Sequence, residues 1–270
     1  MSKNPFSSYD FKSNETFVSK VEQAGFSYPA PKENKTPYSE VETFFHDNYI
    51  PNVEVNSPEF VAGNLCTSVD ELTFGGNLVL GTNLNVDKPV ILKEGKSLLL
   101  NLNNKKIVAG TFAESNGEVT EGDSDSYTFW VKEGGMLSIE GDGEVVAQDA
   151  SYSMAVWAQG GTVEIKGGKF YNGGNGCDLI YASAGGKVYI FGGEFHATER
   201  TGEVSGTKNK FSALNIKDAD KATSRIVVYG GKFYGFDPAN NVSENPAMNF
   251  CAEGYISVEV EPGVFEVRKA

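Results

Sequence analysis

The side chains that carry acid–base and metal chemistry are sparse and scattered in this chain. Glu121, Asp123 and Asp125 are closely spaced, but they lack the glycine and the terminal glutamate of an EF-hand calcium loop. We interpret them as a solvated acidic loop. His46 and His196 lie far apart, and His196 occupies a position that is tyrosine in related segments. The sequence therefore predicts no metal, no cofactor and no catalytic residue.

The three cysteines indicate no covalent or zinc framework. Cys66, Cys177 and Cys251 are odd in number and form no C-x-x-C motif. No histidine or aspartate stands at a spacing that would pair with one of them as an activated nucleophile. We expect all three to be reduced thiols.

Charge and hydropathy exclude several kinds of partner for the 270-residue chain. Its formal net charge is −13 and its pI is about 4.7, which argues against duplex nucleic acid, because phosphate binding needs a clustered basic surface. The start, MSKNPFSSYD, lacks the apolar core of a signal peptide, and no run of about 18 apolar residues occurs. We expect synthesis in a cytoplasm without secretion and no membrane insertion.

A glycine–aromatic motif recurs in the second half of the chain, as KGGKFYNGG (166–174), FGGEFH (191–196) and YGGKFY (229–234). Short strand-like segments around it repeat with a similar period, so that three columns can be aligned. The first column holds 129–131, 155–157, 180–182, 214–216 and 250–252, the second 137–139, 163–165, 188–190, 226–228 and 258–260, and the third Val145, Phe170, Phe195, Phe233 and Phe265.

A period of about 25 residues with three strands predicts an all-β fold, a parallel β-helix of about six coils that share one core. Right-handed winding is favoured because parallel crossovers have that hand. Glycine pairs between the first two columns mark corners that need positive φ or close backbone approach. Outward residues before the third column alternate in charge, which favours this register. They are Glu144, Lys169, Glu194 and Lys232.

Insertions and outward carboxylates bear on where a site can lie. The excursions at 109–126, 197–210 and 237–247 follow the third column, so they are expected along one edge. In the second column the outward acids are Glu164 and Glu259. At the spacing of stacked strands they would be about 14 Å apart, too far for the roughly 5–10 Å of a glycosidase pair.

One outward stripe is apolar: Trp130, Val156 and Tyr181 in the first column. Three such residues on adjacent rungs form a contiguous exposed patch, which calls for an explanation. Three interpretations are open: a subunit interface between three copies of the chain, a platform on which sugar rings stack, or a face that is covered by a loop.

Residues 1–65 lack the repeat and form a separate segment, with residues 66–270 as the β-helix domain. Short helices are expected at about 14–24 and from Ser39, where Ser39 and Glu42 match a capping box. The segment is rich in aromatics for a free tail. We interpret it as an arm that binds a partner through Phe6, Phe11, Phe17, Phe26, Phe44 and Phe45.

The stretch LLLNLNNKKIV (98–108) resembles the first rung of pectin-lyase-like right-handed β-helix proteins, with Asn104 at the place of a glycine. With the aromatic arm and the closing stretch NFCAEGYISVEVEPGVFEV (249–267), the chain also resembles head-fibre and capsid-decoration proteins of tailed, crAss-like gut bacteriophages. That resemblance implies a virion structural protein, a homotrimer held to a capsid protein by its N-terminus. Contact with host-surface glycans is an additional hypothesis for such a protein. The alternative is a polysaccharide depolymerase with a site between subunits.

Overall fold

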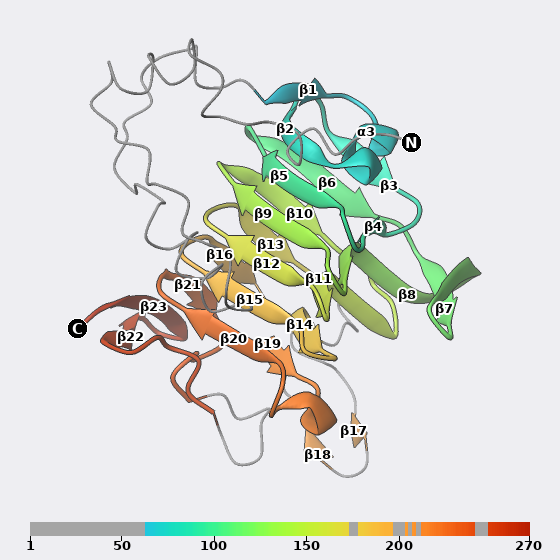
Figure 1. Ribbon diagram of the computed structural model, residues 1–270. Coiled ribbons are helices and arrows are strands. Elements are labelled where there is room, and N and C mark those ends of the chain that lie inside the picture. Colours follow the sequence, from blue (N-terminus) through green and yellow to red (C-terminus); the bar gives the residue numbers. More distant parts are fainter. Residues whose placement is uncertain (1–62, 173–177, 197–202, 205–206, 209–211, 241–247) are drawn as a thin grey trace, which may run out of the picture. The chain divides into compact units, whose positions relative to one another are not determined.

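The computed structural model describes residues 63–172, 178–196, 203–204, 207–208, 212–240 and 248–270, which are mostly β-structure (Figure 1). Three sheets contain almost all of the strands, and pairing within them is predominantly parallel. The predicted all-β class with parallel sheets is confirmed. The helices predicted before residue 63 lie outside the described residues.

The three sheets are named A, B and C. Sheet A contains β1 (Asn64–Cys66), β2 (Gly76–Leu80), β5 (Ser97–Asn101), β9 (Met136–Glu140), β12 (Thr162–Ile165), β15 (Lys187–Ile190) and β20 (Arg225–Val228). Sheet B contains β3 (Leu84–Val86), β6 (Lys105–Ala109), β10 (Gly143–Val146), β13 (Lys169–Tyr171), β16 (Glu194–His196), β21 (Gly231–Tyr234), β23 (Val264–Lys269) and β22 (Tyr255–Glu261). Sheet C contains β4 (Val90–Leu92), β8 (Glu118–Lys132), β11 (Tyr152–Gln159), β14 (Asp178–Ser183) and β19 (Ser212–Ile216).

The smaller elements lie before or between these strands. Strand β7 (Phe112–Ser115) pairs antiparallel with β8, and β17 (Glu203–Val204) with β18 (Thr207–Lys208). The helix α3 (Val69–Phe74) precedes β2, and a 3-10 turn, η1 (Asp218–Asp220), follows β19. Helix α3 begins with a capping box, in which Ser68 and Glu71 exchange side-chain to backbone hydrogen bonds. The sequence analysis missed this helix because only six residues separate its caps.

The chain visits sheets A, B and C in a fixed order. From β2 to β19 it completes five such circuits, and β20 and β21 begin another. Each new strand pairs in parallel with its equivalent in the preceding circuit, for example Val163 of β12 with Leu137 of β9 and Val188 of β15. Successive circuits therefore stack, as the coloured ribbon in Figure 1 shows.

The core consists of ladders formed by equivalent inward residues. In sheet B, Phe170, Phe195 and Phe233 are fully buried and stack with ring centroids 5.1 and 4.7 Å apart. Their strands pair in the predicted register, which also places Glu144, Lys169, Glu194 and Lys232 side by side on the outer face. The predicted third column is thus confirmed through Phe233.

The predicted glycine corners are explained at Gly134 and Gly135. Gly134 has φ of 71°, which an L side chain rarely adopts. A Cβ at Gly135 would lie 2.5 Å from the carbonyl oxygen of Leu92 in the preceding circuit. The pairs Gly160-Gly161 and Gly185-Gly186 repeat this division between positive φ and close approach. Asn104, at the place of a glycine in the resemblance, likewise has a positive φ of 58°.

Two column assignments are wrong at the C-terminal end, and a third is wrong in β11. Residues 258–260 lie in β22, which runs antiparallel to β23 and does not extend sheet A. Residues 250–252 lie beside β20 through a bridge from Cys251 to Val228, not beside β19. Phe265 does face Phe233, but from an antiparallel strand. The Pro262-Gly263 turn, with φ of 74° at Gly263, reverses the chain there.

The register of β11 differs from the prediction by one residue. Val156 pairs with Phe129 and Ile180, and Trp157 pairs with Trp130 and Tyr181. The stretch Met154–Trp157 is apolar at every position, so alternation could not fix its phase. A slip of one residue exchanges the inner and outer faces of a strand. The change therefore moves Val156 into the core and Trp157 to the outer face.

The long insertions leave the circuits at the predicted edge. The β7–β8 hairpin and the β17–β18 pair both interrupt the passage from a strand of sheet B to a strand of sheet C. The described part of the third excursion, Asp237–Asn240, also follows a sheet B strand. Strand β1 begins at Asn64, just before the predicted domain start at residue 66.

Candidate functional site

A groove lies on the outer face of sheet C, and its floor comes from two neighbouring strands. Trp157 and Gln159 project from β11, and Tyr181 and Ser183 project from β14. Trp157 pairs with Tyr181 and Gln159 with Ser183, so the floor has an aromatic row and a polar row. The groove has a volume of about 520 Å³, within the range of roughly 300–1,000 Å³ typical of small-molecule sites.

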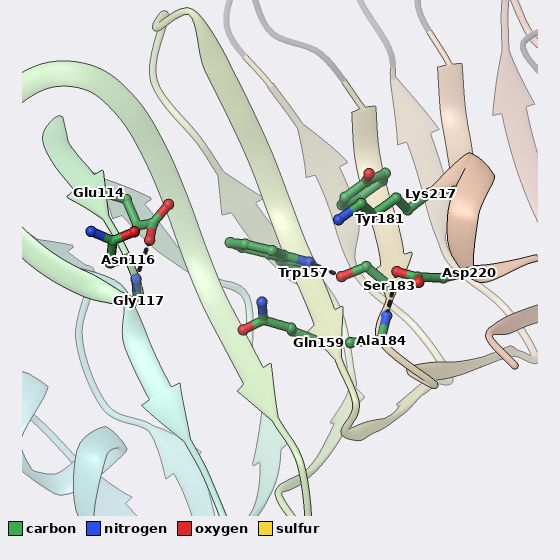
Figure 2. A pocket seen from close by; sticks show the side chains of 10 residues that line it. All are labelled: Glu114, Asn116, Gly117, Trp157, Gln159, Tyr181, Ser183, Ala184, Lys217 and Asp220. Atoms are coloured by element: carbon green, nitrogen blue, oxygen red, sulfur yellow. Dashed lines mark hydrogen bonds between the residues drawn. The ribbon is translucent and has the colours of Figure 1, made fainter.

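Two inserted segments form the walls (Figure 2). One wall is the tip of the β7–β8 hairpin, which contributes Glu114, Asn116 and Gly117. The opposite wall contains Ala184 after β14, Lys217 after β19 and Asp220 at η1. The walls are therefore built from insertions at two corners of the circuits, while the floor is built from the regular strands.

A satellite hydrophobic cluster supports the aromatic row. Phe112, Tyr127, Trp130 and Met154 are buried beneath the hairpin, outside the main core. Trp130 stacks on Trp157 with ring centroids 4.7 Å apart and planes 5° apart, and Tyr127 meets both indoles edge to face. One face of the Trp157 ring is thus covered by Trp130. The other side of Trp157 is directed toward Tyr181, whose ring centroid is 6.2 Å away.

Hydrogen bonds between the two rows fix the floor. Trp157 Nε1 donates to Ser183 Oγ at 2.8 Å, and Trp130 Nε1 donates to Gln159 Oε1 at 3.1 Å. The second bond orients the amide of Gln159, so that its NH₂ group remains as a donor at the groove. Both indoles are consequently held in one rotamer, and the floor is preorganised before any ligand binds.

Lys132 and Asp125, both in β8, hold the hairpin wall in place. Lys132 Nζ lies 3.8 Å from the Trp130 ring centroid and donates to Gly117 O at 3.1 Å. Asp125, which is 5% exposed, accepts hydrogen bonds from Tyr127 Oη at 2.5 Å, from Ser124 Oγ and from the Glu114 backbone. The prediction of a solvated acidic loop is therefore wrong for Asp125. Glu121 and Asp123 are exposed as predicted, but they lie in strand β8 and not in a loop.

The two carboxylates of the groove are held by their own walls. Glu114 Oε1 accepts from Gly117 N at 2.5 Å, and Asp220 Oδ2 accepts from Ala184 N at 2.7 Å. Figure 2 shows them on opposite sides of the floor. Each keeps lone pairs for a ligand, since a carboxylate has about four acceptor sites.

The predicted apolar stripe needs correction. Trp130 and Val156 have no exposed surface, because the hairpin covers the first and the register of β11 turns the second inward. Tyr181 is half-buried and does line the groove. The sequence reasoning missed Trp157, Gln159 and Ser183. The pattern W-x-K, W-x-Q, Y-x-S, at 130–132, 157–159 and 181–183, contained the signal, because it aligns the aromatic and polar rows.

The other predicted candidates lie elsewhere. Glu164 forms an ion pair with Lys166 at 2.8 Å on sheet A, whereas Glu259 lies in β22 and accepts from Gly263 N. They do not share a sheet, so the predicted separation along one column does not apply. The phenylalanines assigned to the arm (Phe6, Phe11, Phe17, Phe26, Phe44, Phe45) and Cys177 lie outside the described residues.

His196 belongs to a ladder on the outer face of sheet B. Its ring stacks between Tyr171 and Tyr234, with centroids 4.7 and 3.9 Å away. Burial lowers the pKa of His196, and the Glu194 carboxylate, 3.5 Å from Nε2, opposes that shift. Burial tends to raise the pKa of Glu194, but the hydrogen bond and charge of Lys169 outweigh it and bring the pKa below its usual value. His196 is therefore a residue of the outer surface of the repeat, as predicted.

The described cysteines are free thiols with raised pKa values. Burial raises the pKa of Cys66, and burial together with the charge of Asp237 raises the pKa of Cys251 to about 11. A thiol with such a pKa is a poor nucleophile at neutral pH. Within the described ranges no group of three or more His, Cys, Asp or Glu side chains is arranged to hold a metal ion. Neither α3 nor η1 is long and apolar enough to cross a bilayer.

Comparison with known proteins gives no match to a protein-family model, to a curated protein or to a solved structure. The function of the groove is therefore inferred from its own chemistry.

Proposed function

We propose that residues 63–270 form a right-handed parallel β-helix of about six coils and act as a non-enzymatic glycan-binding module of a virion. The five stacked A–B–C circuits and the partial sixth support the helix, since each circuit adds one parallel strand to every sheet. Right-handed winding is the hand of nearly all parallel crossovers. Such a stack is rigid, which suits a protein that displays a binding surface.

The observation that carries the proposal is the floor of the groove. A sugar ring has apolar C–H patches and a periphery of hydroxyl groups. The aromatic row of Trp157 and Tyr181 offers apolar contact, and the polar row of Gln159 and Ser183 lies directly beside it. Amphipathic ligands of this kind are recognised by aromatic side chains together with a few fixed polar groups. The walls add an ammonium group at Lys217 and the acceptors of Glu114 and Asp220.

The virion assignment rests on the resemblance of the sequence to head-fibre and capsid-decoration proteins of tailed phages. In this proposal the N-terminal segment that precedes residue 63 anchors the chain to a capsid protein. The homotrimer remains part of the proposal, but its contacts cannot include Trp130 or Val156, which are buried. Large apolar side chains that are exposed elsewhere are the candidates for that interface: Leu65, Phe74, Leu99, Tyr152, Ile256 and Val260.

A specific observation also favours the alternative, a polysaccharide depolymerase. Two carboxylates, Glu114 and Asp220, line the same groove from opposite walls, and glycoside hydrolysis requires such a pair. We rank it second because each carboxylate accepts a hydrogen bond from the backbone of its own wall, which suits a fixed acceptor.

Titration calorimetry of the full chain against a panel of bacterial capsular polysaccharides tests the proposal. We expect binding without release of reducing ends or unsaturated sugars. Trp157→Ala should abolish binding, whereas Lys93→Ala, an exposed truncation outside the groove, should leave it unchanged. Polysaccharide cleavage that is lost in Glu114→Gln and in Asp220→Asn would establish the depolymerase instead.

The anchoring role is tested separately. A chain that starts at residue 63 should keep its β-sheet circular dichroism signal and its glycan affinity but fail to join particles. Fusion of residues 1–65 to an unrelated soluble protein should confer particle binding. Normal occupancy of the shortened chain on particles would show that the anchor lies in the β-sheet unit.

A further inference from the structure

We infer that the groove is selective for uncharged saccharides and discriminates against acidic ones, such as polymers of uronic or sialic acids. This inference rests on the proposed glycan-binding function and adds the class of sugar. It follows from the balance of charge and of hydrogen-bonding groups around the floor.

The charges that line the groove sum to a negative value. Glu114 and Asp220 contribute two carboxylates and Lys217 one ammonium, and the remaining lining residues are neutral. The whole chain adds to this field, with a formal net charge of −13. An acidic sugar would therefore approach a surface of like charge and give up its hydration there, both of which oppose binding.

The second lysine near the floor does not offset this balance. Lys132 precedes Gln159 in the polar row, but its ammonium lies over the Trp130 ring and donates to Gly117 O. Its charge is thus engaged in holding the hairpin wall. Lys217 is exposed, and the described residues include no ion-pair partner for it.

The hydrogen-bonding groups also match hydroxyls better than carboxylates. A hydroxyl group both donates and accepts, whereas an ionised carboxylate only accepts. Glu114 and Asp220 each have acceptor sites left after their backbone bonds, and these require donors from the ligand. Gln159 NH₂ and Lys217 Nζ supply donors in return. A neutral sugar satisfies both sets. An acidic sugar has a carboxylate in place of a hydroxyl, and that carboxylate has no proton to donate to Glu114 or Asp220.

The test compares acidic polysaccharides with their own carboxyl-reduced forms. Reduction converts each uronate to the neutral hexose and keeps the linkage and sequence of the polymer. Titration calorimetry of the full chain against a panel of such pairs, at low salt, should give a Kd at least about tenfold lower for the reduced member, a difference of about 1.4 kcal/mol. Because the effect is electrostatic, the Kd ratio, defined as the Kd of the acidic polymer divided by that of its reduced form, should shrink at high ionic strength.

A matched pair of variants isolates the groove carboxylates. Glu114→Gln with Asp220→Asn should lower the ratio several-fold, mainly by admitting the acidic polymer. Glu253→Gln with Asp142→Asn removes the same two charges at exposed positions outside the groove, and the ratio should stay at the wild-type value.

The outcomes separate this inference from the proposed function. Equal or tighter binding of the acidic members would overturn the selectivity and leave glycan binding intact. An equal fall of the Kd ratio in both double variants would overturn the role of the groove carboxylates and would attribute the selectivity to the net charge of the protein. Failure of every member of the panel to bind at millimolar concentration would overturn the proposed function, and this inference with it.

Discussion

The outer faces of sheets B and C carry the same kind of ladder, and among the described residues a groove is found on sheet C. On sheet B, Tyr171, His196 and Tyr234 stack beside a row of alternating charges. On sheet C, Trp130, Trp157 and Tyr181 follow one another beside the polar row. Both faces are regular products of the repeat. The difference lies in the segments that border them.

On sheet B, charged side chains of neighbouring strands pair with one another. Lys169 pairs with Glu194 at 3.3 Å, and Lys106 pairs with Glu144 at 2.8 Å. Sheet C instead receives the β7–β8 hairpin on one side and the segment from Lys217 to Asp220 on the other. The stacked strands therefore supply a regular frame, and insertions at the corners build the walls of the groove on sheet C.

The largest expected effect tests the frame that both faces share. Phe195→Ala should lower the free energy of unfolding by about 3–5 kcal/mol, because a stacked and fully buried ring leaves a cavity with little room to collapse. Chemical denaturation followed by circular dichroism measures it. Lys93→Ala, an exposed truncation, is the control. Equal midpoints for the two variants would mean that the phenylalanine ladder is not a core element.

The next effect separates the two faces by function. Tyr181→Ala should weaken saccharide binding by about tenfold or more, since it removes half of the aromatic row. Tyr234→Ala makes the same truncation at a half-buried tyrosine on sheet B and should leave affinity unchanged. Calorimetry with the best ligand of the panel compares them. A loss of affinity in both variants would place the effect in the fold rather than in the groove.

Much of the frame could be predicted from the sequence because each ladder repeats a residue type. The phenylalanines of sheet B and the charges beside them fix the register there, and the aligned apolar triplets do the same for 137–139, 163–165, 188–190 and 226–228. The glycine pairs predicted the positions of the corners between strands. The predicted strand register was wrong in the stretch Met154–Trp157, where apolar and polar residues do not alternate. It was also wrong where the Pro262-Gly263 turn reverses the chain.

The groove was harder to predict, because half of it lies in segments without a repeat. Tyr181 was identified, but its neighbour Trp157 was displaced by the slip of one residue in β11. Glu114, Lys217 and Asp220 come from insertions, and no periodic signal relates them to the floor. Their proximity follows only from the three-dimensional path of the hairpin and of η1. Sequence reasoning thus located the edge where insertions gather, but not the side chains that meet there.

A smaller effect concerns the wall that distinguishes sheet C. Lys132→Met should loosen the hairpin, because it removes a cation–π contact, worth about 0.5–1 kcal/mol at exposed sites, and a hydrogen bond to Gly117. Hydrogen exchange in 112–121 should rise while the core strands keep their protection. Lys96→Met is a matched control, since Lys96 makes the same two contacts with Phe74 at the end of α3. Its effect should appear at α3 and not at the hairpin.

The smallest effect is the pH dependence of the sheet B ladder. Burial lowers the pKa of His196 in the folded protein below the value of about 6.5 in an unfolded chain. The unfolded state therefore takes up the proton first as pH falls. The stability that His196 contributes is present above about pH 6.5 and is lost as pH falls through the lower, folded pKa. Glu194 also has a lowered pKa, but its contribution is lost only below about pH 4.5, outside this window.

His196→Tyr isolates this contribution, because Tyr171 and Tyr234 occupy the same position in the neighbouring strands. Between pH 7.5 and 5.0 the thermal midpoint of the wild type should fall relative to that of the variant, with the difference developing below about pH 6.5. Tyr171→Phe keeps the histidine and should follow the wild-type curve. Parallel curves for wild type and His196→Tyr would show that the histidine is solvated like an isolated side chain. The two ladders would then differ in packing as well as in their borders.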